Sequence, residues 1–371
     1  MSAVENQVGT SNDHEEEECM LALQLITLST LPMTLRTAVK LNLFETMAKL
    51  TKPGGNQVSA HKLASHIFPA HTPQNPQAAD MLDRIMRLLA SHSILTCRVV
   101  TNPMIGRSER LYGLGPICKY LIPNQDGVSF APLLLLGHEK EMQATWYTLP
   151  EAIIEGGSAF ERAHGMQIFE YGIKEGKLGN LFSQAMHDHS VIIMKKILEQ
   201  YKGFEGLREL VDVGGGLGST LATIVSKYPN INGINFDLPD VIKDAIPSPG
   251  VDHVGGDMFS RVPMGEAIFM KWILHDWSDQ DCLKLLTNCY DALPEYGKVI
   301  VVESVAPEYP QSDVFSKYLF QIDMGMLCLH PVGKERTWKE FESLARGAGF
   351  ASSKLICRAY THWIIEFYKV M

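Results

Sequence analysis

The feature that most constrains the fold is an alternation of strand-like and helix-like segments after Gly206. Apolar, β-rich runs recur as ELVDV, INGINFD, GVDHVGGD, AIFMKWIL and GKVIVVESV, with helical segments ending at Tyr228 and running from Asp279 to Leu293. Strands that alternate with helices predict a parallel sheet covered on both faces. The last stretch, SSKLICRAYTHWIIEFYKV, contains two strand-like runs with no helix between them, so an antiparallel hairpin is expected at the end of the sheet.

The first part of the chain has a different pattern. Apolar residues recur at helical spacing from Met20 to Leu50, and Pro32 interrupts them, so two helices are expected there. A short helix capped by Ser59 and a second over residues 76–91 precede two strand-like runs, ILTCRVV and ERLYGLG. Two helices followed by a hairpin are the outline of a winged helix.

Composition excludes several functional classes. The chain has 371 residues, 46% of them hydrophobic, and its length favours two domains. A net charge of -9, together with only Arg84 and Arg87 as bases on the second of those helices, argues against nucleic-acid binding and favours a scaffold or dimerisation role. A winged-helix regulator that senses a small ligand is the non-enzyme alternative.

The cysteines and the apolar runs bear on location and metal content. The seven cysteines form no CxxC pair, which indicates neither a disulfide framework nor a zinc site, and a reducing cytoplasm fits them best. The acidic N-terminus is unlike a targeting peptide, and no apolar run reaches about 18 residues, so no membrane association is expected.

Glycines and acids follow the predicted strands. LVDVGGGLGS contains Gly214, Gly216 and Gly218 after an apolar strand, where they allow a tight turn and close approach to a nucleotide-like ligand. Ser219 stands where a dinucleotide fingerprint has Gly or Ala, which disfavours a nicotinamide-dependent dehydrogenase. Asp237, at the end of the next strand, is placed to accept both hydroxyls of a ribose.

The remaining strands end in ionisable residues as well. Asp257 and Met258 follow the third strand, Lys271 to His275 the fourth, and Glu303 ends the fifth. Each residue taken alone has an ordinary structural interpretation, as a turn residue or a packed histidine. Because ligands bind outside the carboxyl ends of the strands in an open parallel sheet, the set predicts a ligand crevice at this edge.

The motifs LVDVGGGLG, GINFDLP, HVGGDMF, FMKWILHDWSD, GKVIVVES and GKERT resemble the plant small-molecule O-methyltransferases of the caffeic acid O-methyltransferase type, which use S-adenosylmethionine. The likeness covers nearly the whole chain. It implies an α/β fold: a doubly wound, Rossmann-like sheet with an antiparallel terminal hairpin. It also implies a winged-helix dimerisation domain over residues 1–124, a catalytic domain over 125–371 with its core at 206–371, and a homodimer.

The resemblance assigns roles residue by residue. His275 matches the family's general base, and Glu303 and Glu335 match the acids that flank it. Positions that match cofactor contacts are Gly214, Asp237, Leu238, Asp257, Met258 and Lys271. Positions that match the substrate pocket are Asp276, Phe182, Met186, His189, Met326 and His330. The cofactor would leave as S-adenosylhomocysteine, and no metal is expected.

Methyl transfer explains why such residues are needed. A phenol pKa near 10 and an imidazole pKa near 6.5 make full proton transfer uphill by about 5 kcal/mol. Two carboxylates beside His275 would raise the imidazole pKa, and a nearby sulfonium cation would lower that of the phenol. One acid would also fix the tautomer, so that the other ring nitrogen faces the substrate.

Several pocket positions depart from the caffeic acid enzymes. Leu136 and Gly137 stand where those have Met and Asn, Leu178 replaces a phenylalanine, and Gly325 and His330 stand for Ile and Asn. We therefore expect a roomier pocket and an acceptor such as a phenylpropanoid, lignan, flavonoid, stilbene or alkaloid phenol. Caffeic acid or 5-hydroxyferulic acid, the acceptors of lignin synthesis, are the alternative.

Overall fold

The structure is a computed structural model that describes residues 11–51, 57–68, 75–101 and 108–370. It divides into two compact units, Met1–His138 and Glu139–Met371, and each is described by itself. The first unit extends to His138 because Ala131, on the helix that ends at Gly137, belongs to its apolar core. The domain boundary after residue 124 stays a prediction.

The first unit is mostly helical. Its helices are α1 (Ser11–Thr27), α2 (Thr30–Lys40), α3 (Leu43–Leu50), α4 (Ala60–Ile67), α5 (Ala78–Ser91), the short 3-10 helix η1 (Pro116–Tyr120) and α6 (Ala131–Gly137). The prediction of two helices over residues 20–50 was wrong, because three are present. Pro32 lies in the first turn of α2, and the unpredicted break falls at Asn42, which adopts a left-handed conformation with φ 49°.

A small antiparallel sheet completes this unit. Its strands β1 (Val58–Ser59), β2 (Leu95–Thr101) and β3 (Ser108–Leu114) lie in the order β1-β3-β2. Tyr112 of β3 is fully buried, and its hydroxyl donates a 2.7 Å hydrogen bond to Asp83 of α5. Helices followed by this hairpin give the winged-helix outline that the sequence predicts.

Among the described residues, no single helix is long and apolar enough to cross a membrane. The helices over His14–Thr27 and Thr30–Lys40 reach the length and apolar composition of a membrane span only when they are taken together, and they are bent by 44° relative to each other.

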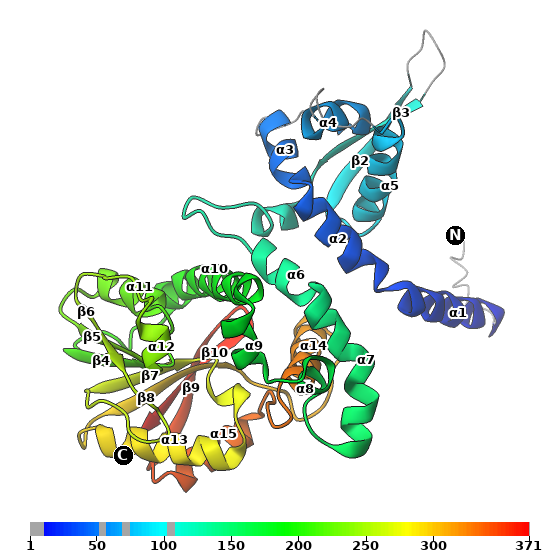
Figure 1. Ribbon diagram of the computed structural model, residues 1–371. Coiled ribbons are helices and arrows are strands. Elements are labelled where there is room, and N and C mark those ends of the chain that lie inside the picture. The colour runs from blue at the N-terminus through cyan, green and yellow to red at the C-terminus, as the bar shows by residue number, and fades with distance from the viewer. Residues whose placement is uncertain (1–10, 52–56, 69–74, 102–107, 371) are drawn as a thin grey trace, which may run out of the picture. The chain divides into compact units, whose positions relative to one another are not determined.

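A seven-stranded mixed sheet forms the centre of the second unit (Figure 1). The strands are β4 (Glu209–Val213), β5 (Asn232–Asp237), β6 (Val251–Gly255), β7 (Ala267–Lys271), β8 (Lys298–Ser304), β9 (Ser352–Ala359) and β10 (His362–Tyr368). Their order is β6-β5-β4-β7-β8-β10-β9, parallel from β6 to β8 and antiparallel at β10 and β9. Both the parallel sheet and the terminal hairpin are as predicted.

Helices cover both faces of this sheet. In Figure 1, α10 (Gly176–Gln200) and α11 (Ser219–Lys227) lie on one face, and α13 (Asp279–Ala292) and α15 (Trp338–Gly347) lie on the other. Alternate residues of a strand point to opposite faces, so Leu210 packs with the first pair of helices and Val211 with the second. Burial on both faces explains why β7 reads as a continuous apolar run.

The remaining elements of the second unit connect or flank the sheet. They are α7 (Lys140–Glu155), α8 (Ala159–His164), α9 (Ile168–Lys174), α12 (Pro239–Ile242), the 3-10 turn η2 (Leu274–Asp276) and α14 (Val314–Leu329). The η2 turn follows β7 directly and precedes α13, so it lies at the carboxyl edge of the sheet.

Candidate active site

The glycine-rich loop between β4 and α11 is the first component of the site. Gly214, Gly216 and Gly218 have φ values of 70°, 57° and 86°, a region that side chains rarely adopt. A Cβ atom on Gly214 would lie 2.3 Å from Ile273 Cδ1, so a larger residue here would have to displace the Ile273 side chain as well as adopt a positive φ. A Cβ atom on Gly216 would meet nothing within 4 Å, so the loop backbone borders open space there.

Asp237, at the carboxyl end of β5, lies beside this loop. Its Oδ2 accepts a 2.8 Å hydrogen bond from Gly216 N, and its Oδ1 accepts one of 2.7 Å from Leu238 N. Burial raises the pKa of Asp237, although these two backbone bonds act to lower it. Leu238 follows with its side chain more than half exposed. The pair therefore borders the open space above the loop.

Asp257 and Met258 follow β6 on the same edge. The Asp257 carboxylate accepts hydrogen bonds from Ser260 Oγ at 2.8 Å and from Phe259 N at 2.9 Å. These bonds lower its pKa, so the group is anionic at neutral pH. The Met258 carbonyl accepts a 2.9 Å bond from Asn288 of α13, which ties the loop to a helix.

Lys271 ends strand β7, and Trp272 follows it. The Lys271 ammonium lies 4.5 Å from the centre of the Trp272 ring. Desolvation lowers the pKa of Lys271 to about 8, although Glu303 and Asp212 act to raise it. Trp272 has φ 55°, a strained value for a large side chain, and the β7 backbone turns sharply at this point.

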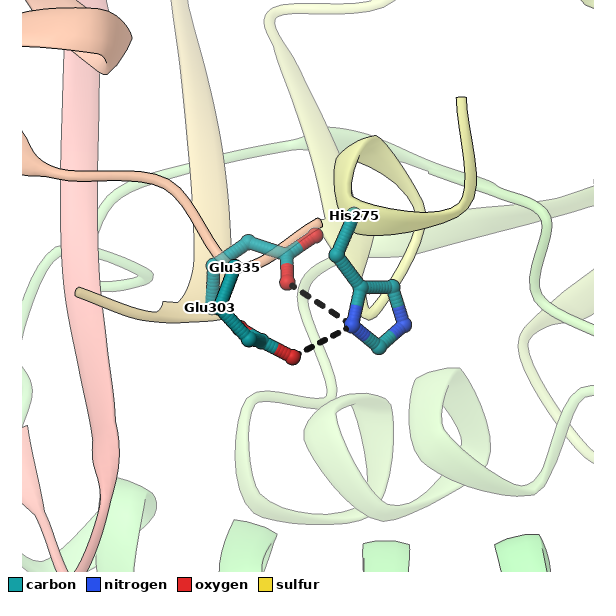
Figure 2. A group of neighbouring side chains, drawn as sticks. All are labelled: His275, Glu303 and Glu335. Carbon is teal, nitrogen blue, oxygen red and sulfur yellow. Dashed lines mark hydrogen bonds and ion pairs between the residues drawn. The ribbon is translucent and has the colours of Figure 1, made fainter. Parts of the chain in front are cut away.

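His275 of η2 lies beside two glutamates, which both face the same ring nitrogen (Figure 2). Its Nδ1 lies 2.9 Å from Glu335 Oε1 and 4.0 Å from Glu303 Oε2, and both glutamates are buried. Its Nε2 lies 3.6 Å from Asp276 Oδ1. The sheet brings Glu303 to this place, since Lys271 of β7 pairs with Val302 of β8. The structure thus brings together the three residues that the sequence selected as catalytic.

The negative charges of the surrounding carboxylates keep the His275 imidazole protonated. Burial acts to lower the pKa of His275, but the negative charges of Glu303, Asp276 and Glu335 outweigh it and raise the pKa to about 10. Burial raises the pKa of Glu303 to about 7, although the His275 charge acts against that rise. The imidazole is therefore cationic at neutral pH before any other cation enters the site.

The same three side chains also meet the spacing of a metal site. One ligand atom from each of His275, Glu303 and Glu335 lies within 4.8 Å of the others, so the group could hold a metal ion. Imidazole and carboxylate are both ligands of divalent transition metals. A raised imidazole pKa opposes metal binding, because the ligand must first lose its proton. The absence of a metal stays a prediction.

The predicted substrate residues fall into two groups. Phe182 of α10 and His330 both contact Phe169 of α9, with ring centres 6.5 and 5.1 Å apart. His330 Nε2 also lies 3.9 Å from Asp276 Oδ1, which links the first group to His275. Burial lowers the pKa of His330, although Asp276 acts to raise it.

The second group lies along α10 and α14. His189 is buried and stacks on Trp272 with ring centres 4.1 Å apart, and the same indole stacks on His275 at 5.7 Å. Met186 lies between Phe182 and His189 at helical spacing, so the three share one face of α10. Met326 of α14 is buried, next to the Gly333 backbone.

Sequence reasoning missed several residues that shape this site. Phe169 joins Phe182 to His330, and Trp272 joins His189 to His275. The third missed residue is Arg336 of the GKERT motif. Its side chain is fully buried and donates a hydrogen bond to the turn that carries His275. The motif was a usable signal for Arg336, because it places an arginine directly after Glu335.

Two domain families match the chain. The O-methyltransferase domain matches residues 146–351, and the O-methyltransferase dimerisation domain matches residues 23–124. Caffeic acid 3-O-methyltransferase 1 of Populus tremuloides is 53% identical over 368 residues, which is 99% of each chain. Esculetin O-methyltransferase of Kitagawia praeruptora is 53% identical over 358 residues, which is 96% of each chain.

Solved structures with low sequence identity share the fold. Human N-acetylserotonin methyltransferase, in complex with SAM, matches with a TM-score of 0.78 at 19% identity and 100% coverage of both chains. Mitomycin 7-O-methyltransferase MmcR matches with a TM-score of 0.73 at 23% identity, covering 97% of this chain and 99% of that one.

The sheet, its glycine loop and the matched domains define an O-methyltransferase that uses S-adenosylmethionine. The chain belongs to the plant O-methyltransferase family that includes the caffeic acid 3-O-methyltransferases. The family, the fold and the enzyme class predicted from the sequence are therefore confirmed. The dehydrogenase and the winged-helix regulator are set aside.

Proposed function

We propose that this enzyme transfers the methyl group of S-adenosylmethionine to a phenolic hydroxyl of a plant aromatic metabolite, with His275 as the general base. The observation that carries the proposal is the orientation of one imidazole. Nδ1 of His275 is held by Glu335, so in the neutral imidazole Nε2 is the ring nitrogen available to an acceptor. Glu303 and Glu335 stabilise the imidazolium that forms when the proton arrives.

The neutral form of His275 would act as the base: its unprotonated Nε2 would take the phenol proton, and the phenol oxygen would form the new C–O bond with the methyl group that the bound cofactor would supply, with S-adenosylhomocysteine as the leaving group. When bound, the cofactor supplies an electrophilic methyl group on a sulfonium, whose positive charge also lowers the pKa values of nearby groups. Aligning the reacting atoms is worth about 7 to 11 kcal/mol when the geometry is good.

The residues at the carboxyl edge fit that cofactor. Open space above Gly216 admits a ligand against the loop backbone, and Asp237 lies beside it to accept the ribose hydroxyls. Asp257 and Met258 are assigned to the adenine, and Lys271 to the methionine end. Leu238, with its exposed side chain, is assigned to the nucleoside as well. Calorimetric titration with S-adenosylhomocysteine tests these assignments without any acceptor.

We propose an acceptor larger than a simple hydroxycinnamate, from the phenylpropanoid, lignan, flavonoid, stilbene or alkaloid phenols. A Cβ atom on Gly325 would meet nothing within 4 Å, so the branched side chain usual there in the caffeic acid enzymes would project into open space. His330, where asparagine is usual, adds an aromatic ring packed on Phe169. His330 also changes the polar surroundings of Asp276, because its Nε2 lies 3.9 Å from Asp276 Oδ1.

Caffeic acid or 5-hydroxyferulic acid is the second candidate acceptor, since relatives 53% identical to this chain are caffeic acid 3-O-methyltransferases. A panel of phenols with labelled methyl donor, ranked by kcat/KM, decides between the two. The reverting variants Gly325→Ile and His330→Asn are the matched controls, and both should raise kcat/KM for caffeic acid relative to larger phenols. Caffeic acid as the best substrate of the unchanged enzyme would contradict the larger acceptor.

We also propose a homodimer. The dimerisation domain matches residues 23–124, and α1 exposes an apolar set that an isolated protomer would leave in water, namely Met20, Leu21, Leu23, Leu25 and Ile26. The stretch near Thr27 would then contribute to the partner's pocket. Sedimentation at micromolar concentration tests this, and a monomer there would contradict it.

A further inference from the structure

Arg336 is among the largest side chains that are fully buried in the described residues. Its guanidinium donates to the Leu274 carbonyl from Nη1 at 2.5 Å and to the Trp277 carbonyl from Nη2 at 2.8 Å. Nε and Nη2 donate to Asp279 Oδ1 at 2.9 and 2.7 Å. One buried cation therefore serves two backbone carbonyls and one carboxylate.

The two carbonyls that Arg336 binds lie on either side of His275. Leu274 precedes the histidine, and Trp277 follows Asp276, so the guanidinium spans the whole turn that carries the imidazole. The segment that carries Arg336 adds a backbone bond, since Lys334 N donates to the His275 carbonyl at 2.9 Å. We call residues 334–336 the clasp.

The clasp joins the base to its acid. Glu335 meets the His275 imidazole through its side chain, and the next residue, Arg336, holds the backbone of the same turn. The clasp is itself fixed at two points: Glu335 N donates to Asp323 Oδ1 at 2.8 Å, and Ala306 N donates to the Arg336 carbonyl at 2.8 Å. Movement of the turn relative to Glu335 would therefore require breaking bonds to Arg336.

Burying a guanidinium is costly unless it is paired and hydrogen-bonded. Here the partner carboxylate, on Asp279 at the first turn of α13, is half exposed. Partial burial acts to raise the pKa of Asp279, but the bonds from Arg336 and Lys334 outweigh it and lower the pKa. Two of the four hydrogen bonds that Arg336 donates go to backbone carbonyls on either side of His275, and two go to Asp279. The two backbone bonds point to a role in holding the turn.

We infer that Arg336 is a positioning residue, which fixes His275 in reach of Glu335 and of the acceptor by clamping the backbone on both sides of the base. The inference rests on the proposed role of His275. Arg336 touches neither the imidazole nor the acceptor in this scheme. Misplacing a base by about 1 Å can cost about a hundredfold in rate, so a residue of this kind has a large effect from a distance.

The test compares Arg336→Lys and Arg336→Met with Lys298→Met. Lys298 pairs with the buried Glu366 at the opposite end of β8, so its variant controls for loss of a buried ion pair. We expect Arg336→Met to lower kcat by about a hundredfold and Arg336→Lys by about tenfold. The affinity for S-adenosylhomocysteine, measured by calorimetry, should change little in all three.

The pH profile of kcat/KM separates positioning from general stability. The charged and titratable groups around His275 are Glu303, Asp276, Glu335, His330 and His362. A loosened turn moves the imidazole away from Glu303 and Glu335, whereas Asp276 moves with it, so the acid limb of the profile should shift to lower pH in the Arg336 variants. The limb should stay in place for Lys298→Met.

A double variant with His275→Gln completes the test. If Arg336 acts through the base, adding Arg336→Met to His275→Gln costs little more, because the two losses are not additive. Full additivity, or an unshifted acid limb with normal kcat at a lowered melting temperature, would overturn the inference. If Arg336→Met does not fold, Arg336→Lys decides on the same readouts. Normal turnover of His275→Gln alone would instead remove the base from the proposed function.

Discussion

Replacing Glu335 by glutamine removes one charge from the site and keeps its shape. The glutamine carbonyl can still accept the hydrogen bond from His275 Nδ1, which Glu335 Oε1 accepts at 2.9 Å. The tautomer is therefore preserved, and the electrostatic support for the imidazolium is weakened. Because Glu303 and Asp276 remain, the pKa of His275 should fall only part of the way from about 10 toward its ordinary value.

The size of the expected pKa shift follows from the 2.9 Å contact between His275 Nδ1 and Glu335 Oε1. Loss of an opposite charge at hydrogen-bond distance changes a pKa by about 1 to 3 units, which is about 1.4 to 4 kcal/mol. A base acts only when unprotonated, so a lower pKa leaves more of the active form at neutral pH but makes that form weaker. The acid limb of kcat/KM should thus move down by about 1 to 3 pH units, and the plateau at high pH should fall.

The assay is kcat/KM from pH 6 to 11, which reports the ionisation of the free enzyme and the free acceptor. A ring-fluorinated acceptor with a more acidic hydroxyl identifies the limb that belongs to the phenol. Glu308→Gln, a change in an exposed glutamate paired with Lys339, is the matched control and should leave the profile in place. An acid limb that is the same in Glu335→Gln and the unchanged enzyme would refute the reasoning.

Four further predictions follow. His275→Gln should lower turnover by at least about a hundredfold while S-adenosylhomocysteine still binds normally in calorimetry. Asp237→Ala should weaken S-adenosylhomocysteine binding, and unchanged affinity would discredit the ribose assignment. Thr337→Ala removes the capping box of α15, in which Glu340 is the partner, and should lower the free energy of unfolding in urea by about 1 kcal/mol. Prolonged treatment with a metal chelator should leave the rate unchanged, and a loss restored by a divalent cation would contradict the metal-free scheme.

The sheet could be predicted because its signals are local. Apolar runs bounded by glycine and acid mark each strand of the parallel sheet, and parallel strands place their carboxyl ends on one edge. That edge assembles Asp237, Lys271 and Glu303 from distant parts of the sequence. The break before α3 also had a local signal, since Asn42 is one of the few residue types that adopt a left-handed conformation readily.

Other features depend on contacts that no local pattern contains. Trp272 adopts its strained φ of 55° within a stack of rings, where His189 lies on α10 and His362 on β10. An arginine in a polar segment reads as exposed, yet Arg336 is buried because the carbonyls it binds lie about 60 residues earlier in the chain. Such long-range partners are fixed only once the sheet and its covering helices have packed.

The strand next to β7 supplies one of the acids that face His275. Glu303 of β8 uses one carboxylate oxygen to accept the N–H groups of Ile273 and Leu274, both at 2.9 Å, and directs the other toward His275 Nδ1. The same carboxylate therefore holds the backbone of the turn and stabilises the protonated form of the imidazole. Since both acids lie beside Nδ1, that nitrogen keeps its proton, and in the neutral imidazole only Nε2 is left to receive a proton from the acceptor.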